Sequence, residues 1–361
     1  MLITDVFTAD LIAAYMTEAF SNRIPYMGAA YFPDKKKMGI DLSWLKSHKG
    51  LGVALKPSNF DAIPTIRPRG KAEMTKEQMP LFRESMIVKE TDLMELARIR
   101  EKNDPFLQPV IDSMYDDVRT LVEGAEIATE KMRMQLMAPV NGEPVISIGL
   151  ADNTIYSYDY DSDDSWKNTH YLELIGAAKW DQPTTAKPLN DIRTATQYLA
   201  SIGVTATTII GNSATLDLLL ENDQVKNALV TMTGSTINFV DESTVEEVLR
   251  RRTRLEWMSY DKMYKDYDGV EKKFFPDGYV TIAGSGNLGS TWRGTTPEEL
   301  TTIGNFMNLP QAPVDIAVLA NGIAVAVQNE YKPSFTVTTT ASQIALPSFE
   351  GMDTIFVIKV K

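Results

Sequence analysis

The sequence predicts an α+β fold in which one region of the chain is interrupted by another. A long run of helical periodicity occupies residues 104–138, and two short strands follow at 145–150 and 154–160. From residue 187 the pattern changes to alternating helices and strands, and the end of the chain returns to strands alone. A chain that leaves a region of helix and strand, forms an α/β insertion and then returns is expected to contain a discontinuous domain.

The composition is that of a folded protein without disulfides. Of the 361 residues, 43% are hydrophobic and 23% are charged, so the chain has ample material for a packed core. The absence of cysteine excludes disulfide scaffolds, thiolate metal sites and cysteine nucleophiles, and fits a reducing cytoplasm. The formal net charge of −12 argues against a protein whose main task is to bind nucleic acid, because neutralising phosphates requires a surplus of Lys and Arg.

No segment of the sequence is expected to enter a membrane. A transmembrane helix needs about 20 apolar residues, and the longest apolar stretch, Ile316 to Gln328, is shorter and is interrupted by Asn321-Gly322. The first residues lack a basic region and contain Asp5 and Asp10, so they do not resemble a signal peptide. We therefore expect a protein that stays inside the cell that makes it.

The clearest single element is the helix predicted over residues 104–138. Asp104 is a suitable N-cap and Pro105 suits the first helical position. Apolar residues then recur mostly at steps of three and four, and Pro139 should end the helix. At about 1.5 Å per residue the helix would be roughly 50 Å long. No other segment could serve as its coiled-coil partner, so it is predicted to be the spine of a flat domain.

The first part of the chain carries less pattern. Residues 1–50 contain a short helical pattern over 8–20 followed by irregular sequence, which is typical of an arm. Residues 51–95 are rich in proline and in charges of both signs, which favours an extended, two-stranded excursion lying on a neighbouring subunit. We expect both segments to bury their apolar residues on neighbours alone.

The later helices and strands are short. Residues 243–254 are predicted to be a helix with a capping box formed by Ser243 and Glu246. Two i,i+4 pairs, Glu246 with Arg250 and Glu247 with Arg251, mark either a solvated face or an inter-subunit contact. The other predicted helices are 192–202, 213–221 and 223–230, and the predicted strands are 204–210, 237–240, 279–283, 335–339 and 354–360.

A glycine-rich run at Gly284–Gly289 has the spacing of a dinucleotide-binding loop and follows a predicted strand. The fingerprint also needs a helix directly after the glycines and an acidic residue about 20 positions on. The residues that follow are typical of a loop, so a structural glycine-rich loop is favoured over a cofactor site.

An acidic run from Asp159 to Asp164 resembles the start of a calcium-binding loop. Asp164 stands where an EF-hand requires glycine, and His170 stands where it requires a bidentate Glu. The run is interpreted as a solvated acidic loop, and a weak surface cation site is the alternative.

Ser213, between a predicted strand and a predicted helix, resembles a nucleophile elbow. The glycine that would close the elbow is replaced by Thr215, and a catalytic triad would have to use His48 or His170. An N-cap role for Ser213 explains the residue better.

Residues 269–282 carry the most specific pattern in the chain. Two tight turns, Asp268-Gly269 and Pro276-Asp277-Gly278, flank the Lys272-Lys273 pair and lead into a strand. This run resembles a segment late in the lambda-type major capsid protein E family, the shell proteins of tailed phages. Weaker anchors occur in that family's order over nearly the whole chain; they are Phe32-Pro33, Lys36, Asp41, residues 51–54, Pro57, Arg67, Arg69-Gly70, Met79-Pro80 and Lys89.

The resemblance implies the tailed-phage/herpesvirus-type major capsid fold. In its terms, residues 1–50 are an N-terminal arm and 51–95 an extended loop. Residues 96–186 and 326–361 form a peripheral domain built on the spine helix, and residues 187–325 form an α/β axial domain. No long scaffolding segment precedes the arm, so the resemblance implies a separate scaffolding protein.

The implied function is structural, with no catalytic residue, cofactor or metal. A major capsid (head) protein of a tailed phage or prophage self-assembles as hexamers and pentamers into an icosahedral shell around double-stranded DNA. Its partners would be further copies of itself, the scaffolding protein, a portal and, where one exists, a decoration protein. It would enclose DNA without sequence-specific binding and without a membrane, assembling in the host cytoplasm and residing in the virion.

Two alternatives stay open at this point. One is a related shell, an encapsulin-like nanocompartment, which a cargo-loading groove would distinguish. The other belongs to a different class, a dinucleotide-binding oxidoreductase that uses Gly284–Gly289. For the shell, the candidate inter-subunit contacts are Arg67, Arg69, Lys71, Glu73, Glu246, Arg250 and Arg251.

Overall fold

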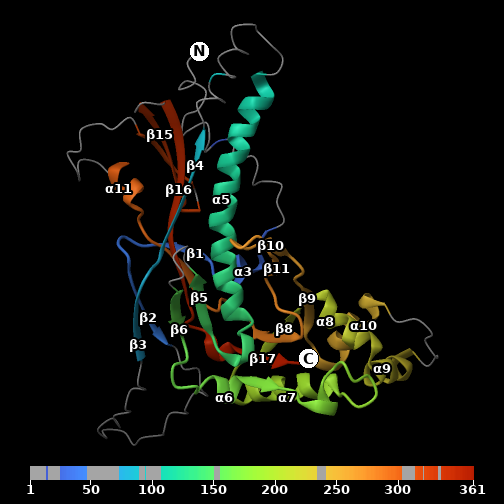
Figure 1. The fold of residues 1–361 in the computed structure, drawn as a ribbon. Coiled ribbons are helices and arrows are strands. Elements are labelled where there is room, and N and C mark those ends of the chain that lie inside the picture. Colours follow the sequence, from blue (N-terminus) through green and yellow to red (C-terminus); the bar gives the residue numbers. More distant parts are fainter. Residues whose placement is uncertain are drawn as a thin grey trace, which may run out of the picture. The chain divides into compact units, whose positions relative to one another are not determined.

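A computed structural model describes residues 25–46, 73–88, 107–149, 155–233, 241–302, 314–319, 321–331 and 335–361, together with the single residues 14 and 94. The chain divides into two compact units (Figure 1). Unit 1 comprises Met1–Leu42, Lys76–Lys131 and Ser290–Ser348, and unit 2 comprises Ser43–Thr75, Met132–Gly289 and Phe349–Lys361.

The predicted long helix is confirmed as α5, Leu107–Met137. It ends two residues before Pro139, as expected, and the predicted cap at residue 104 lies outside the described residues. In unit 1 the helix buries Val118, Leu121 and Val122. The last turns of the helix belong to unit 2, and all their side chains from 132 to 137 are buried except that of residue 135. The buried apolar residues are Met132, Met134, Leu136 and Met137.

Unit 1 is built on a six-stranded sheet in the order β1-β13-β16-β15-β14, with β4 paired to β16. The long strand β16 has three partners: β15 and β4 along its first part and β13 along its end. Figure 1 shows β4, β16 and β15 running beside the first part of α5. The strands are β1 (Asp34–Lys36), β4 (Leu81–Val88), β13 (Ser290–Arg293), β14 (Val314–Val318), β15 (Ala324–Tyr331) and β16 (Phe335–Ser348).

The expectation that the arm and the extended loop bury apolar residues on neighbours alone is wrong for their described parts. Phe32, which follows helix α3 (Met27–Tyr31), is fully buried, and β1 pairs in parallel with β13. Met79 is 4% exposed, and β4 pairs with β16 over eight residues. The strand partners lie more than 200 residues away in sequence, which is why local pattern could not find them.

The predicted excursion has a paired base. Strands β2 (Asp41–Lys46) and β3 (Glu73–Gln78) form a two-stranded sheet, and the segment that joins them, 47–72, lies outside the described residues. The excursion itself therefore stays a prediction, whereas its two ends are fixed by hydrogen bonding to each other.

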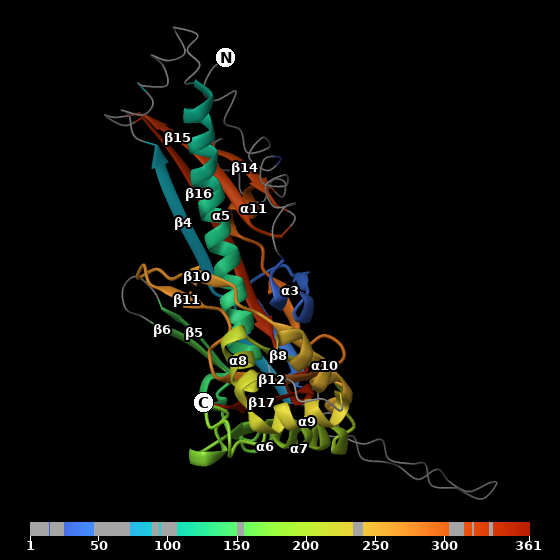
Figure 2. The same ribbon diagram turned by 90° about the vertical axis from the view of Figure 1, so that its right-hand side faces the viewer.

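Unit 2 is built on a five-stranded mixed sheet in the order β7-β17-β12-β8-β9, beside which four helices pack (Figure 2). The central strands β17, β12 and β8 are antiparallel, and the edge strands β7 and β9 are parallel to their neighbours. The strands are β7 (Tyr171–Glu173), β8 (Ala206–Gly211), β9 (Glu256–Ser259), β12 (Tyr279–Gly284) and β17 (Ile355–Lys359), and the helices are α7 (Pro188–Ser201), α8 (Ser213–Glu221), α9 (Asp223–Thr233) and α10 (Glu242–Thr253).

Strand β12 is the centre of unit 2, because both of its faces are covered. Val280 and Ile282 point into the apolar cluster formed with the four helices. On the opposite face, the hydroxyl of Thr281 donates a 2.7 Å hydrogen bond to the carbonyl of Met137, at the end of α5. The strand that the family-like segment leads into is thus fully buried.

Short elements complete unit 2. Two hairpins are formed by β5 with β6 and by β10 with β11. The remaining bounds are β5 (Val145–Gly149), β6 (Ile155–Asp159), β10 (Met263–Lys265), β11 (Glu271–Lys273) and α6 (Lys167–His170), with 3-10 turns η1 (Val140–Gly142), η2 (Gly176–Ala178) and η3 (Met352–Thr354). In unit 1, α11 covers Pro297–Thr302.

The boundaries of the two units differ from the predicted domain boundaries. The boundary drawn at residue 325 falls inside β15, and β17, assigned from sequence to the peripheral domain, lies in the sheet that β8 and β12 share. The cause is that hydrogen-bonded strand partners are distant in the sequence. The division into arm, loop, peripheral and axial parts, which is defined by roles in a shell, stays a prediction.

Two predicted helix caps are wrong by one or two residues. Helix α8 is capped by Asn212, whose side chain accepts from the amide of Thr215, and not by Ser213. Helix α10 is capped by Asp241, which accepts from the amide of Thr244, so the capping box at Ser243 does not form. In both places an Asx residue precedes the predicted cap and takes the role.

Two glycines should respond oppositely to alanine. A Cβ at Gly294 would lie 2.5 Å from Ile344 Cγ2 and 3.0 Å from the carbonyl oxygen of Gly39, whereas a Cβ at Gly124, inside α5, has nothing nearer than 4.0 Å. We expect Gly294→Ala to lower the free energy of unfolding by about 1–3 kcal/mol through overpacking. Gly124→Ala should raise it by about 0.5–1 kcal/mol. Denaturant unfolding of unassembled subunits measures both, and a stable Gly294→Ala subunit would contradict the packing.

His170 should make stability fall in mild acid. It lies between the ring of Trp166, stacked at 5.7 Å, and that of Tyr198 at 5.0 Å, and burial lowers its pKa. The unfolded chain, with a His pKa of about 6.5, then binds the proton more readily than the folded chain. Stability is therefore complete above that pH and declines as the pH falls toward the folded pKa. The loss of Tm between pH 7.5 and pH 5.5 should be smaller in His170→Phe, and an equal loss would contradict this.

Candidate assembly surfaces

Helix α10 presents a charged face to solvent. Val245, Val248 and Leu249 are fully buried against the core of unit 2, which fixes the rotation of the helix about its axis. Glu246 and Arg250, both predicted contact residues, consequently lie on the exposed side.

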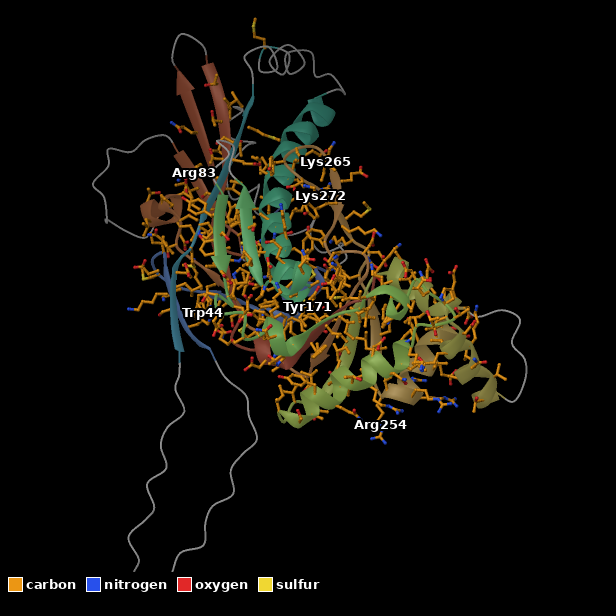
Figure 3. All side chains as sticks on the ribbon, turned by 60° about the horizontal axis from the view of Figure 1, so that its bottom comes forward. Trp44, Arg83, Tyr171, Arg254, Lys265 and Lys272 are labelled. Atoms are coloured by element: carbon orange, nitrogen blue, oxygen red, sulfur yellow. The ribbon has the colours of Figure 1, made fainter. Side chains whose placement is uncertain are left out.

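The C-terminal end of α10 is strongly basic. Arg250, Arg251 and Arg252 occupy its last turn and Arg254 is its C-cap, all four exposed. Arg251 forms the predicted ion pair with Glu247, whereas the predicted pair between Glu246 and Arg250 does not form. Figure 3 shows the side chain of Arg254 pointing away from the ribbon. Positive charge at a helix C-terminus is favourable, by a few tenths of a kcal/mol to about 1 kcal/mol.

The other predicted contact residues belong to the extended loop. Arg67, Arg69 and Lys71 lie outside the described residues. Glu73 is the first residue of β3, and its side chain is outside what the structure describes. Their role in inter-subunit contact stays a prediction.

A buried guanidinium joins the arm to the sheet in unit 1. Arg293, on β13, is 4% exposed and donates to Asp34 of β1 at 3.1 Å, to Gln343 of β16 at 2.6 Å and to Thr129 of α5 at 3.3 Å. Because an unpaired buried charge is costly, the four segments must meet for this residue to be tolerated. No local pattern in the sequence points to this cluster.

Two carboxylates of α11 fasten further strands of unit 1. Glu299 pairs with Lys36, the last residue of β1, and Glu298 pairs with Arg83 of β4 at 2.5 Å. The hydroxyl of Ser342, on β16, also donates to Glu298 at 2.6 Å. Both acids lie in the first turn of the helix, where the helix dipole favours negative charge. The only sequence signal for these ion pairs is Pro-Glu-Glu, which is typical of the start of a helix.

The family-like segment 269–282 has a clear structural role in unit 2. Lys272 of the β10–β11 hairpin donates to Asp266 at 2.6 Å and to Asp268 at 3.3 Å, and these contacts raise its pKa (Figure 3). Lys273 pairs with Asp277 at 2.8 Å. Asp277 in turn accepts from Asn212, the N-cap of α8, at 2.5 Å. The paired lysines and the Pro-Asp turn thus hold the hairpin and the helix cap in place.

The glycine-rich run does not form a dinucleotide site. Gly289 leads directly into the strand β13, whereas the pyrophosphate-binding turn requires a helix at that point. Gly284 closes β12, and a Cβ there would lie 2.8 Å from Val204. The run is a connection between two strands. The one sequence feature that favoured a dinucleotide-binding oxidoreductase is therefore explained without a cofactor.

The other candidate sites have structural explanations. The hydroxyl of Ser213 donates to Asp261 at 2.5 Å, and His170 is buried between aromatic rings, so the geometry of a nucleophile elbow is absent there. The carboxylate of Asp161 accepts from the amides of Trp166 and Lys167, which shapes the acidic loop. Among the described residues, no three His, Asp or Glu side chains are arranged to hold a metal ion, and no helix is long and apolar enough to cross a membrane.

Loss of the Arg293 guanidinium should destabilise the subunit. We expect Arg293→Met to lower the free energy of unfolding by about 2–4 kcal/mol, because a buried hydrogen-bonding centre is removed. Arg119→Met is the matched control: Arg119 is 44% exposed and pairs with Glu123 on the surface of α5, so its loss should cost below about 1 kcal/mol. Urea unfolding compares the two, and equal effects would show that Arg293 is dispensable.

Three solved structures of phage proteins have a similar fold. A proposed capsid protein of a prophage of E. coli CFT073 matches with a TM-score of 0.61 and 13% identity, covering 98% of this chain and 99% of that one. A phage-related protein from Bordetella bronchiseptica RB50 matches with a TM-score of 0.52, 12% identity and coverage of 98% and 96%. The capsid of cyanophage A-1(L) matches with a TM-score of 0.51, 11% identity and coverage of 93% and 92%. The predicted major capsid fold is therefore confirmed.

The sequence comparison agrees with the fold. No curated protein gives a significant match to the sequence. The profile of the family described as phage major capsid protein E, in contrast, matches residues 8–330. This confirms the resemblance drawn from residues 269–282 and the weaker anchors. The chain therefore belongs to the phage major capsid protein E family and is a capsid shell protein, a structural component of a virion.

Proposed function

We propose that this chain forms the icosahedral head of a tailed phage by closing as hexamers and pentamers around double-stranded DNA. The observation that carries the proposal is the family match over residues 8–330, which spans most of the predicted arm and all of the predicted loop, spine helix and axial domain. A closed shell needs heterologous contacts, in which two different surfaces of one subunit meet on adjacent copies.

The base of the extended loop supports this proposal. The ends of segment 47–72 are joined by the pairing of β2 with β3, and β4, which follows β3, is anchored on β16. A loop of this length with a fixed base can reach a neighbouring subunit without disturbing the fold of the subunit to which it belongs. The positive charges at Arg67, Arg69 and Lys71 would then be available for contacts on that neighbour.

The proposal also covers the partners of the protein and the place where it assembles. A separate scaffolding protein would guide closure in the host cytoplasm, a portal would occupy one vertex, and a decoration protein could cover the finished surface. The net charge of −12 favours a shell wall that repels packaged DNA rather than binding it. The encapsulin-like alternative gains no support, because the matching family is one of phage capsid proteins.

Electron microscopy of the purified chain, expressed alone and together with its neighbouring genes, tests the function. We expect closed shells, or rings of five and six subunits, in at least one of the two conditions. The matched variant replaces residues 47–72 with a short Asn-Gly turn, which suits a two-stranded antiparallel hairpin. This variant should keep the circular dichroism and Tm of the unassembled subunit but form no shells. Small discrete particles from the natural chain under both conditions would contradict the proposed function, and shells formed by the variant would contradict the role of the loop.

A further inference from the structure

Three arginines at the end of α10 have no partner within the described part of the chain. The guanidinium groups of Arg250, Arg252 and Arg254 form no ion pair or hydrogen bond there, whereas Arg251 binds Glu247. The whole chain is acidic, with 48 carboxylate and 36 basic side chains, so unused acidic groups are not scarce. The helix dipole stabilises each positive charge by a few tenths of a kcal/mol. This stabilisation does not explain why four arginines, which repel one another, lie within five positions.

The backbone at Arg254 gives a second and independent reason to look for a partner. This residue caps α10 in the left-handed conformation, with φ 64° and ψ 21°. Glycine occupies this position in many helices, because a side chain there costs about 1–2 kcal/mol. A long side chain kept in this conformation and exposed to solvent indicates that its guanidinium, rather than its backbone, is needed.

Unit 2 also carries a complementary acidic surface. Asp163 and Asp164 are exposed in the loop before α6, and the buried Asp161 holds this loop by accepting from the amides of Trp166 and Lys167, each at 2.9 Å. A hydrogen bond from Ser165 lowers the pKa of Asp163, so this carboxylate is charged at neutral pH. The nearest base, Lys167, is itself paired with Glu143 at 2.9 Å.

The two charged surfaces lie on different elements of the same unit. Figures 1 and 2 show α7 between α6, next to the acidic loop, and α10. A two-fold contact between copies through either surface would bring like charges together, which is unfavourable. A head-to-tail contact brings opposite charges together, and repetition of such a contact produces a ring when the rotation between neighbouring copies closes.

We propose that the arginine cluster at the end of α10 (Arg250, Arg252 and Arg254) binds the Asp163–Asp164 loop of the next copy of this chain within a ring of subunits. Arginine can grip carboxylates through two parallel hydrogen bonds, which fixes orientation as well as adding energy. The inference rests on the proposed function, since it assigns a contact within the shell. Packaged DNA is the competing partner for exposed arginines, and the experiment separates the two.

A charge exchange tests the contact in the full-length chain, under conditions in which the natural chain assembles. The first variant carries Arg252→Glu and Arg254→Glu, the second carries Asp163→Lys and Asp164→Lys, and the third carries all four changes. Each double variant should lower the yield of shells on a sedimentation gradient by about tenfold or more, because like charges then face each other. The fourfold variant should recover the yield to within about threefold of the natural chain.

A matched control shows that the effect is local. Arg193→Glu with Lys187→Glu makes the same change of charge at two exposed positions of unit 2, on α7 and at its N-cap, that belong to neither charged surface, and it should leave the yield unchanged. Tm and circular dichroism of the unassembled subunits establish that each variant folds, and variants that fold are compared.

Two results would overturn the contact. The first is normal assembly of the arginine variant, and the second is a fourfold variant that assembles no better than the two double variants. If the arginine variant assembles normally and also loses affinity for a double-stranded DNA oligonucleotide, the cluster is assigned to DNA. Failure of the natural chain to form shells is a different outcome, seen before any variant is made, and it counts against the proposed function.

Discussion

The buried guanidinium of Arg293 is the constraint on which the organisation of unit 1 depends. It gathers the arm, the spine helix and the longest strand of the sheet around one charge, through Asp34, Thr129 and Gln343. These residues come from positions spread over most of the chain, so no single segment of unit 1 can satisfy the charge locally. A buried charge that loses a partner is destabilising, which makes the arrangement cooperative. Residues 25–40 of the predicted arm, which the structure describes, are therefore part of the folded subunit.

Unit 2 is held by a different kind of interaction. Its sheet is buried through apolar side chains on one face, and β12 lies at the centre with Val280 and Ile282 in the core. The family-like segment before β12 then serves as a frame: Lys273 and Asp277 link the hairpin to Asn212, which caps α8. Residues that resemble a family pattern are thus explained by folding and not by a ligand. This explains how a pattern rich in Lys and Asp occurs in a segment whose described contacts are all structural.

An element can be predicted from the sequence when the interactions that form it join residues close together in the chain, and it is missed when they join distant residues. The C-terminal end of the long helix is predicted to within one residue, because its periodicity and Pro139 are local signals. Strand β16 runs to Ser348, well beyond the predicted end at 339, because polar residues such as Gln343 lie between strands that pair from elsewhere in the chain. The caps were missed because neighbouring Asn and Asp residues compete with Ser for the same role. Of the candidate contacts, the α10 residues are exposed as expected. Arg254 is not among them, because its left-handed backbone is visible only in the structure.

The charges of the chain therefore fall into two groups with different physical behaviour. Pairs such as Arg293 with Asp34 are formed within the subunit and are shielded from solvent on the arginine side, so salt screens them weakly. The arginines at the end of α10 are exposed, and an attraction between them and acidic groups on another copy would be screened over roughly 8–10 Å at physiological ionic strength. The first group specifies the shape of one subunit and the second is available for association. A shell protein benefits from this separation, because contacts between copies must be weak enough to be corrected during assembly while the subunit itself remains folded.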